Sequence, residues 1–195
     1  MSARLTQQQF TLVAIFALFA LPLLIAWVAF EGAGTRWSFP TRNHGILIQA
    51  PRPVSMEGLH DLRGNSLKAG FWQRHWTLLY VTRTVCNDHC KRALDTMQRV
   101  RLALGEDMKR VQNVNVDIEV GDGDLAPKHI PGLWTLQATP RWLSRFRKIA
   151  GEKPPSGSIY IIDPQGLQMM FYPPGADPRG VLEDIKRLLK VSVVG

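Results

Sequence analysis

The pattern of hydrophobic and polar positions divides the chain into an apolar run near the N-terminus and a longer mixed region. Residues 1–9 are a short, mostly polar segment, and residues 10–30 contain no charged side chain. Because about 20 apolar residues in a helix cross a bilayer, we predict a transmembrane helix at 10–30. Residues 31–53, rich in glycine and proline, are expected to form a linker with one strand at 45–49, and residues 54–195 one globular domain. A cleaved signal peptide is the alternative for the apolar run, although the apolar part of such peptides is usually only about 7–15 residues long.

In the domain, the spacing of apolar residues predicts alternating strands and helices. Runs rich in apolar and β-branched residues predict strands at 76–81, 111–118, 158–162 and 167–172. Apolar residues at helical spacing predict helices at 93–104, 140–149 and 178–190. The first of these helices is expected to bury Leu94, Met97 and Leu102 on one face. A hairpin is expected around 63–65, a loop at 121–131 and a β-turn at 163–166. The resulting order (strand, helix, strand, helix, strand, strand, helix) predicts an α/β domain of thioredoxin-like fold.

The only two cysteines of the chain, Cys86 and Cys90, lie between the strand at 76–81 and the helix that follows it. Residues i and i+4 of a helix have Cβ atoms about 5–6 Å apart. A disulfide needs about 3.5–4.5 Å, so closing a bridge requires unwinding of the first helical turn. The positive end of the helix dipole favours a thiolate at Cys86, and a protonated His89 would add to this effect. The pair therefore suits either thiol–disulfide exchange or binding of a soft metal ion, and an inert pair of thiols is the alternative.

The net charge of +8 belongs to the region after the apolar run, because only Arg4 and Glu31 flank that run. A basic surface suits an anionic membrane or an acidic partner. No nucleic-acid-reading motif accompanies the charge, so nucleic acid is not expected as a partner. The orientation of the helix in the membrane is not decided by the positive-inside rule, because Arg4 on one side is balanced by Arg36 and Arg42 on the other.

The dithiol, the order of the elements and the anchor together resemble the Sco/SenC family of membrane-tethered thioredoxin-like proteins. The resemblance covers residues 59–189 and rests on the Leu-Leu-Tyr-Val strand before Cys86-x-x-x-Cys90, on the segment 159–166 and on the final helix. It implies a domain in the periplasm, held at the bacterial inner membrane, that helps to deliver copper to cytochrome c oxidase subunit II. The partners that it implies are the membrane, this subunit and other oxidase assembly factors, and the implied cofactor is Cu(I).

One departure from the family concerns the third copper ligand, a histidine that precedes the strand at 158–162. Its place is taken by Pro155, and no histidine lies between His129 and the C-terminus. The substitutes available are His89, His129 and the soft thioethers of Met169 and Met170, which are expected to face opposite ways on one strand. In thioredoxins a cis-proline stands near this place, so a proline at position 155 favours thiol–disulfide exchange as the function. The sequence does not reveal the isomer of the Pro154–Pro155 bond.

The sequence alone is compatible with three functions. The first is an oxidase assembly factor in which Cys86 attacks and Cys90 resolves a client disulfide, or in which both hold Cu(I), with His89 as a candidate third ligand. As an enzyme it would be a thiol–disulfide oxidoreductase. The second is a peroxidase-like thiol enzyme, although Thr82 and Arg83 do not have the spacing of peroxiredoxins. The third is a non-catalytic assembly scaffold of the same fold.

Overall fold

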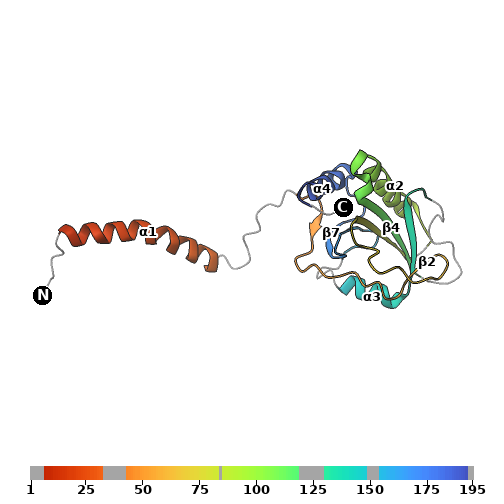
Figure 1. Ribbon diagram of the computed structural model, residues 1–195, viewed down its shortest axis with the longest axis horizontal. Coiled ribbons are helices and arrows are strands. Elements are labelled where there is room, and N and C mark those ends of the chain that lie inside the picture. Colours follow the sequence, from red (N-terminus) through yellow and green to blue (C-terminus); the bar gives the residue numbers. More distant parts are fainter. Residues whose placement is uncertain (1–6, 33–42, 84, 119–129, 149–153, 193–195) are drawn as a thin grey trace. The chain divides into compact units, whose positions relative to one another are not determined.

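A long N-terminal helix forms the first of two compact units. The computed structural model describes residues 7–32, 43–83, 85–118, 130–148 and 154–192. Helix α1 (Gln7–Gly32) contains Pro22, which membrane helices tolerate, and it has no acidic residue in its first turn and no basic residue in its last turn. Its stretch Gln7–Val28 contains an apolar window of mean hydropathy 2.6 and is long enough to cross a membrane. The helix lies near the N-terminus (Figure 1), as both membrane anchors and secretion signals do.

The second unit, residues 43–195, is built on a mixed β-sheet. Among the described residues the sheet has seven strands in the order β1-β7-β6-β3-β4-β5-β2. Strands β3, β4 and β5 are parallel, and the remaining pairs of neighbours are antiparallel. The strands are β1 (Ile46–Leu47), β2 (Leu59–Asp61), β3 (Trp76–Thr82), β4 (Val111–Ile118), β5 (Leu133–Ala138), β6 (Ile159–Ile162) and β7 (Gln168–Tyr172).

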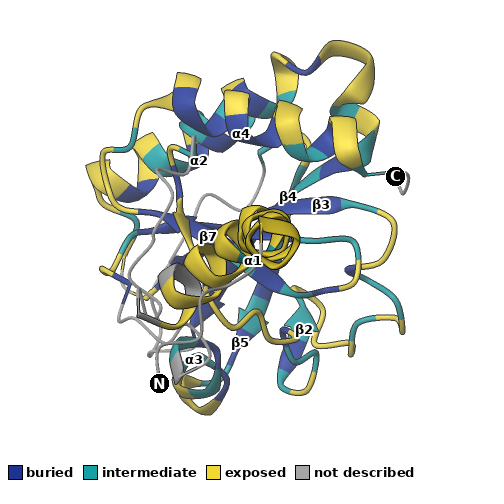
Figure 2. Ribbon diagram, turned by 90° about the vertical axis from the view of Figure 1, so that its left-hand side faces the viewer, coloured by how far each residue is buried: buried dark blue, intermediate teal, exposed yellow. Residues whose placement is uncertain are grey.

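Helices cover both faces of the sheet, and the buried strands lie between them (Figure 2). Helices α2 (Asp88–Leu102) and α4 (Pro178–Val191) contact each other on one face, while α3 (Pro140–Lys148) lies on the other. A short 3₁₀ helix, η1 (Gly105–Arg110), leads from α2 into β4. Because side chains alternate along a strand, β3 contributes Leu78 to the core beneath α2 and α4, and Leu79 to the core beneath α3.

Most of the predicted elements are confirmed, and the differences have clear physical causes. The strand β5 was not predicted, because only Leu136 and Ala138 of its six residues are buried and its pattern is weak. Leu102 is 57% exposed, since α2 ends at this residue and the chain turns away before completing another helical turn. The hairpin is present, with the Asp61 carboxylate accepting hydrogen bonds from the backbone amides of Arg63 and Asn65. The loop predicted at 121–131 falls mainly outside the described residues.

Candidate functional site: the Cys86–Cys90 disulfide

The site lies where β3 leaves the sheet. All seven residues of β3 are buried between β4 and β6, which explains why this apolar run is a central strand. The chain returns through α2 to the parallel strand β4, so the loop between β3 and α2 lies at the carboxyl edge of the sheet. In open α/β sheets this edge is where ligands and reactive groups are placed. Cys86 lies in this loop and Cys90 in the first turn of α2.

Cys86 and Cys90 form a disulfide, with their Cα atoms 5.2 Å apart. The pair does not lie on one continuous helix face, because α2 begins only at Asp88 and leaves Cys86 outside the helix. This agrees with the expectation that the bridge needs an unwound first turn. Asn87 caps α2, its side-chain oxygen accepting a hydrogen bond from the Cys90 backbone amide at 3.1 Å. The cap therefore fixes the position of Cys90 relative to the loop that carries Cys86.

The two sulfur-bearing residues differ in exposure. Cys90 is 4% exposed and belongs to the core beneath α2 and α4. Cys86 is partly exposed and packs against the edge of the same core, next to the strongly exposed Val85. An incoming sulfur atom from another molecule can therefore approach Cys86 more easily than Cys90.

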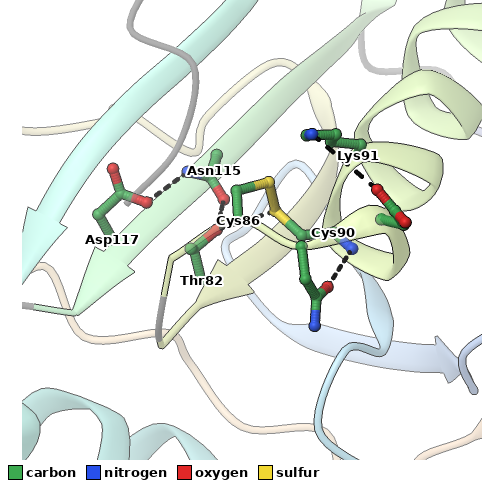
Figure 3. The surroundings of a disulfide bond; sticks show 8 residues. Thr82, Cys86, Cys90, Lys91, Asn115 and Asp117 are labelled. Atoms are coloured by element: carbon green, nitrogen blue, oxygen red, sulfur yellow. Dashed lines mark hydrogen bonds and ion pairs between the residues drawn. A yellow bond between two sulfur atoms is a disulfide. The ribbon is translucent and has the colours of Figure 1, made fainter. Parts of the chain in front are cut away.

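A chain of buried polar side chains extends from Cys90 across the sheet (Figure 3). Thr82 Oγ1 lies 3.8 Å from Cys90 Sγ and donates a hydrogen bond to Asn115 Oδ1 at 2.8 Å. Asn115 Nδ2 in turn donates to Asp117 Oδ1 at 2.7 Å. Thr82 ends β3, and the two β4 residues stand two apart, so all three point to the side of the sheet that carries α2.

Asp117 is the titratable end of this network. Its carboxyl is 7% exposed, and this burial raises its pKa above the ordinary value, against the opposing effect of the hydrogen bond from Asn115. Sequence reasoning missed Thr82, Asn115 and Asp117 as a group. The available signal was the run of polar residues at a spacing of two along β4, namely Asn113, Asn115 and Asp117.

Within the described residues, no histidine joins the two cysteines in a group that could hold a metal ion. Exposed His89 lines the same cavity as Cys90, and its Nδ1 accepts a hydrogen bond from Arg92 Nη2 at 3.2 Å. His129 lies outside the described residues. Within the described ranges, no group of three His, Cys, Asp or Glu side chains is arranged to hold a metal ion.

Met169 and Met170 do not face opposite ways as predicted. A β-bulge pairs Ile161 with Met170 and Ile162 with Gln168, which leaves Met169 as the extra residue on β7. Both methionines consequently pack against the core beneath α2 and α4. The Met170 sulfur lies 3.2 Å from Tyr172 Oη within this core, so this thioether is in contact with a buried side chain.

The segment before β6 lies close to the disulfide. Ser156 and Gly157 line the same cavity of about 470 Å³ as Cys90. Pro155 accepts hydrogen bonds at its carbonyl from the backbone amide and the hydroxyl of Ser158, an arrangement that closes the turn into β6. No described peptide bond is cis, so the Pro154–Pro155 bond is trans, unlike the corresponding bond of thioredoxins.

Comparison with solved structures shows the same fold in copper-loaded and thiol-reactive proteins. Copper-bound ScoI from Arabidopsis thaliana aligns with a TM-score of 0.56 and 16% identity, over 73% of this chain and 99% of that chain. Copper-bound yeast Sco1 aligns with a TM-score of 0.55 and 17% identity, over 69% and 90%. The thioredoxin domain of a thiol–disulfide oxidoreductase from Bacteroides vulgatus aligns with a TM-score of 0.50 and 14% identity, over 70% and 97%.

Sequence comparison gives the family. No curated protein matches the chain. Residues 76–192, which run from β3 through α4, match the family model described as a transmembrane-like, thioredoxin-like, C-terminal domain. The predicted thioredoxin-like fold is thereby confirmed, and its structural neighbours are proteins of the Sco/SenC family. The chain belongs to the family of transmembrane-like, thioredoxin-like C-terminal domains.

Proposed function

We propose that this protein is a membrane-tethered thiol–disulfide oxidoreductase of cytochrome c oxidase assembly, with Cys86 as the attacking thiol and Cys90 as the resolving thiol. The observation that carries the proposal is the disulfide itself, which joins a partly exposed cysteine to a buried one beside an open cavity. Such asymmetry suits exchange, because the accessible sulfur meets the client and the buried sulfur completes the reaction within the protein.

The reaction begins with the reduced form of the pair. The Cys86 thiolate attacks one sulfur of a client disulfide, which forms a mixed disulfide and expels the other client sulfur as a thiolate. Cys90 loses its proton and attacks the Cys86 sulfur, so the Cys86–Cys90 bond forms and the second client sulfur leaves. Two electrons pass to the client, whose two thiolates take up protons. A dithiol donor must then reduce the protein again.

Thr82 is suited to hold Cys90 in its protonated state before it resolves the mixed disulfide. Its hydroxyl hydrogen is donated to Asn115, so its oxygen lone pairs are directed to accept a hydrogen bond from the Cys90 thiol. This contact stabilises the reduced pair and leaves Cys86 as the more readily ionised member. Thr82 is thus a positioning residue in the proposal.

The proposed cellular setting follows from the anchor and the fold. We place residues 1–9 on the cytoplasmic side and 10–30 in the bacterial inner membrane. Residues 31–53 then serve as a linker whose later part adds strand β1 to the sheet, and the thioredoxin-like domain at 54–195 lies in the periplasm. Support comes from the apolar helix α1 and from a dithiol that cycles best in an oxidising compartment. The client we propose is subunit II of the oxidase, at its copper site, since one structural neighbour is described as a member of a family of cytochrome c oxidase assembly proteins with a disulfide switch.

Transient handling of Cu(I) as cargo is the second candidate. Two solved neighbours contain copper, and two thiolates are soft ligands that Cu(I) prefers. The described residues, however, add no third ligand of the histidine, cysteine or carboxylate type beside Cys86 and Cys90. Thiol exchange is therefore the function that the geometry supports better.

The test uses the full chain, reduced and solubilised in a non-ionic detergent. Reduction of hydroxyethyl disulfide by the wild type, with loss of this activity in Cys86→Ser and slow, incomplete exchange in Cys90→Ser, is the expected result. Titration of the same chain with Cu(I) against a chromophoric chelator tests the second candidate. No exchange, together with stoichiometric Cu(I) binding that needs both cysteines, would overturn the proposal in favour of copper transfer. Neither activity, with normal oxidase assembly in cells that carry Cys86→Ser, would favour the scaffold.

A further inference from the structure

Two adjoining hollows lie beside the disulfide. The cavity of about 470 Å³ beside Cys90 shares His89, Gly157 and Pro174 with a second hollow of about 400 Å³ that is lined by residues of α2. The two hollows therefore adjoin each other, and together they make up a groove. An extended polypeptide that lay in this groove would pass beside Cys90 and the disulfide that it forms.

The walls of the groove combine apolar and polar side chains. The second hollow is bounded by Ala93 of α2, by Ile159 at the start of β6, and by Pro173 and Pro174 after β7. The first is bounded by Val81 and Val85, and also by the polar side chains of Asn87 and Ser156. Mixed walls of this kind accept the backbone and the alternating side chains of an extended segment.

Each hollow of the groove contains one arginine. Arg83 lies in the first hollow, and Arg92 lies in the second. Among the described residues neither guanidinium forms an ion pair with a carboxylate, and Arg92 Nη2 lies 3.2 Å from His89 Nδ1. The one acid in the lining, Asp95, is held 2.8 Å from Arg99 Nε and is therefore already neutralised.

We propose that this groove binds an extended, acidic segment of the client polypeptide that flanks the client cysteines. The inference rests on the proposed function, and it adds the chemistry by which a client is selected. Carboxylates on either side of the client disulfide would meet Arg92 in one hollow and Arg83 in the other, while the disulfide lies over Cys86. Charge complementarity of this kind raises the rate of encounter and disfavours basic partners.

Binding is measured separately from redox chemistry. Two fluorescent peptides share one apolar sequence with serines in place of the client cysteines, and one has flanking glutamates where the other has glutamines. Their affinities for the oxidised full chain in non-ionic detergent are measured by anisotropy at low salt. We expect the acidic peptide to bind at least about tenfold more tightly, and the difference to shrink in about 1 M salt, where the screening length is about 3 Å.

Charge-removing variants locate the effect. Arg83→Gln and Arg92→Gln should each weaken binding of the acidic peptide by about threefold. Lys109→Gln is the matched control. This exposed lysine lies in η1, which follows the C-terminal end of α2, whereas the cysteines lie at its N-terminal end. Equal binding of the two peptides, or an equal loss in Lys109→Gln, would overturn the groove proposal. Absence of hydroxyethyl disulfide reduction would overturn the proposed function and leave the binding result to stand by itself.

Discussion

The contact between Thr82 and Cys90 makes a prediction that separates a redox role from a purely structural one. Thr82→Val keeps the shape of the side chain and removes its hydroxyl. The buried Asn115 oxygen then loses the donor that lies 2.8 Å away. An unsatisfied buried acceptor costs about 1–3 kcal/mol, and burial of the extra methyl group returns about 0.8 kcal/mol. We therefore expect the free energy of unfolding to fall by about 0.2–2 kcal/mol, which lowers Tm by up to about 8 °C in a domain of this size.

The loss should depend on the redox state of the cysteines. In the proposed reduced form, Thr82 Oγ1, which lies 3.8 Å from Cys90 Sγ in the disulfide form, would accept a hydrogen bond from the Cys90 thiol worth about 0.5–1 kcal/mol. Thr82→Val should therefore destabilise the reduced form more than the oxidised form. The reduction potential of the pair should become more negative by about 10–20 mV.

The assay is thermal unfolding of the full chain in detergent, oxidised and reduced, with a redox titration of each variant. The matched control is Thr77→Val at the other end of β3, where the fully buried hydroxyl accepts a hydrogen bond from Gln112 at 2.8 Å. This control should lose similar stability in both redox states and keep the wild-type potential. A loss in Thr82→Val that is the same in both states, with no change of potential, would refute the role assigned to Thr82.

Three further predictions concern other polar groups of the domain. Burial raises the pKa of Asp117, so the stability that its protonated form contributes is complete below the ordinary carboxyl pKa of 3.8 and is lost as the pH rises through the folded pKa. In Asp117→Asn this loss should disappear from a plot of Tm across pH 4–8, and a wild-type slope in the variant would contradict the prediction. Asp184 Oδ2 accepts hydrogen bonds from two backbone amides at the start of the domain and from Tyr172 Oη at 3.0 Å. Asp184→Ala should therefore lower the free energy of unfolding, measured with denaturant, by at least about 3 kcal/mol. A decrease below about 1 kcal/mol would show that these donors find other partners. Asn87→Ala removes the cap of α2 and should cost about 1 kcal/mol, whereas Asn87→Ser, which keeps a capping oxygen, should retain most of the stability.

The parts of the fold with strong periodicity could be predicted from the sequence. The buried run of β3, the hairpin of β6 and β7 with its turn at Gly166, and the apolar face of α4 all carry patterns that the folded chain preserves. Strand β5 has no comparable pattern, since four of its six positions remain at least partly exposed. Local spacing was thus sufficient where burial is continuous, and insufficient where it is partial.

The reactive cysteines could be found from the sequence, but their surroundings could not. Cys86 and Cys90 are close along the chain, whereas Thr82 and Asn115 are 33 residues apart and meet only through the parallel register of β3 and β4. The orientation of Met169 depends on a β-bulge that side-chain alternation cannot reveal. Contacts set by strand register and by irregularities of the sheet therefore had to come from the structure.

The central claim, that the cysteine pair exchanges disulfides with an oxidase client, is tested most directly by trapping the mixed disulfide. The full chain with Cys90→Ser is produced in its native membrane, alkylated without reductant, and analysed by mass spectrometry. We predict a covalent complex between Cys86 and a cysteine of an oxidase subunit, which disappears on reduction and does not form when Cys86→Ser is added. Cys90→Ser protein that carries no such partner, in membranes that are actively assembling oxidase, would contradict the account.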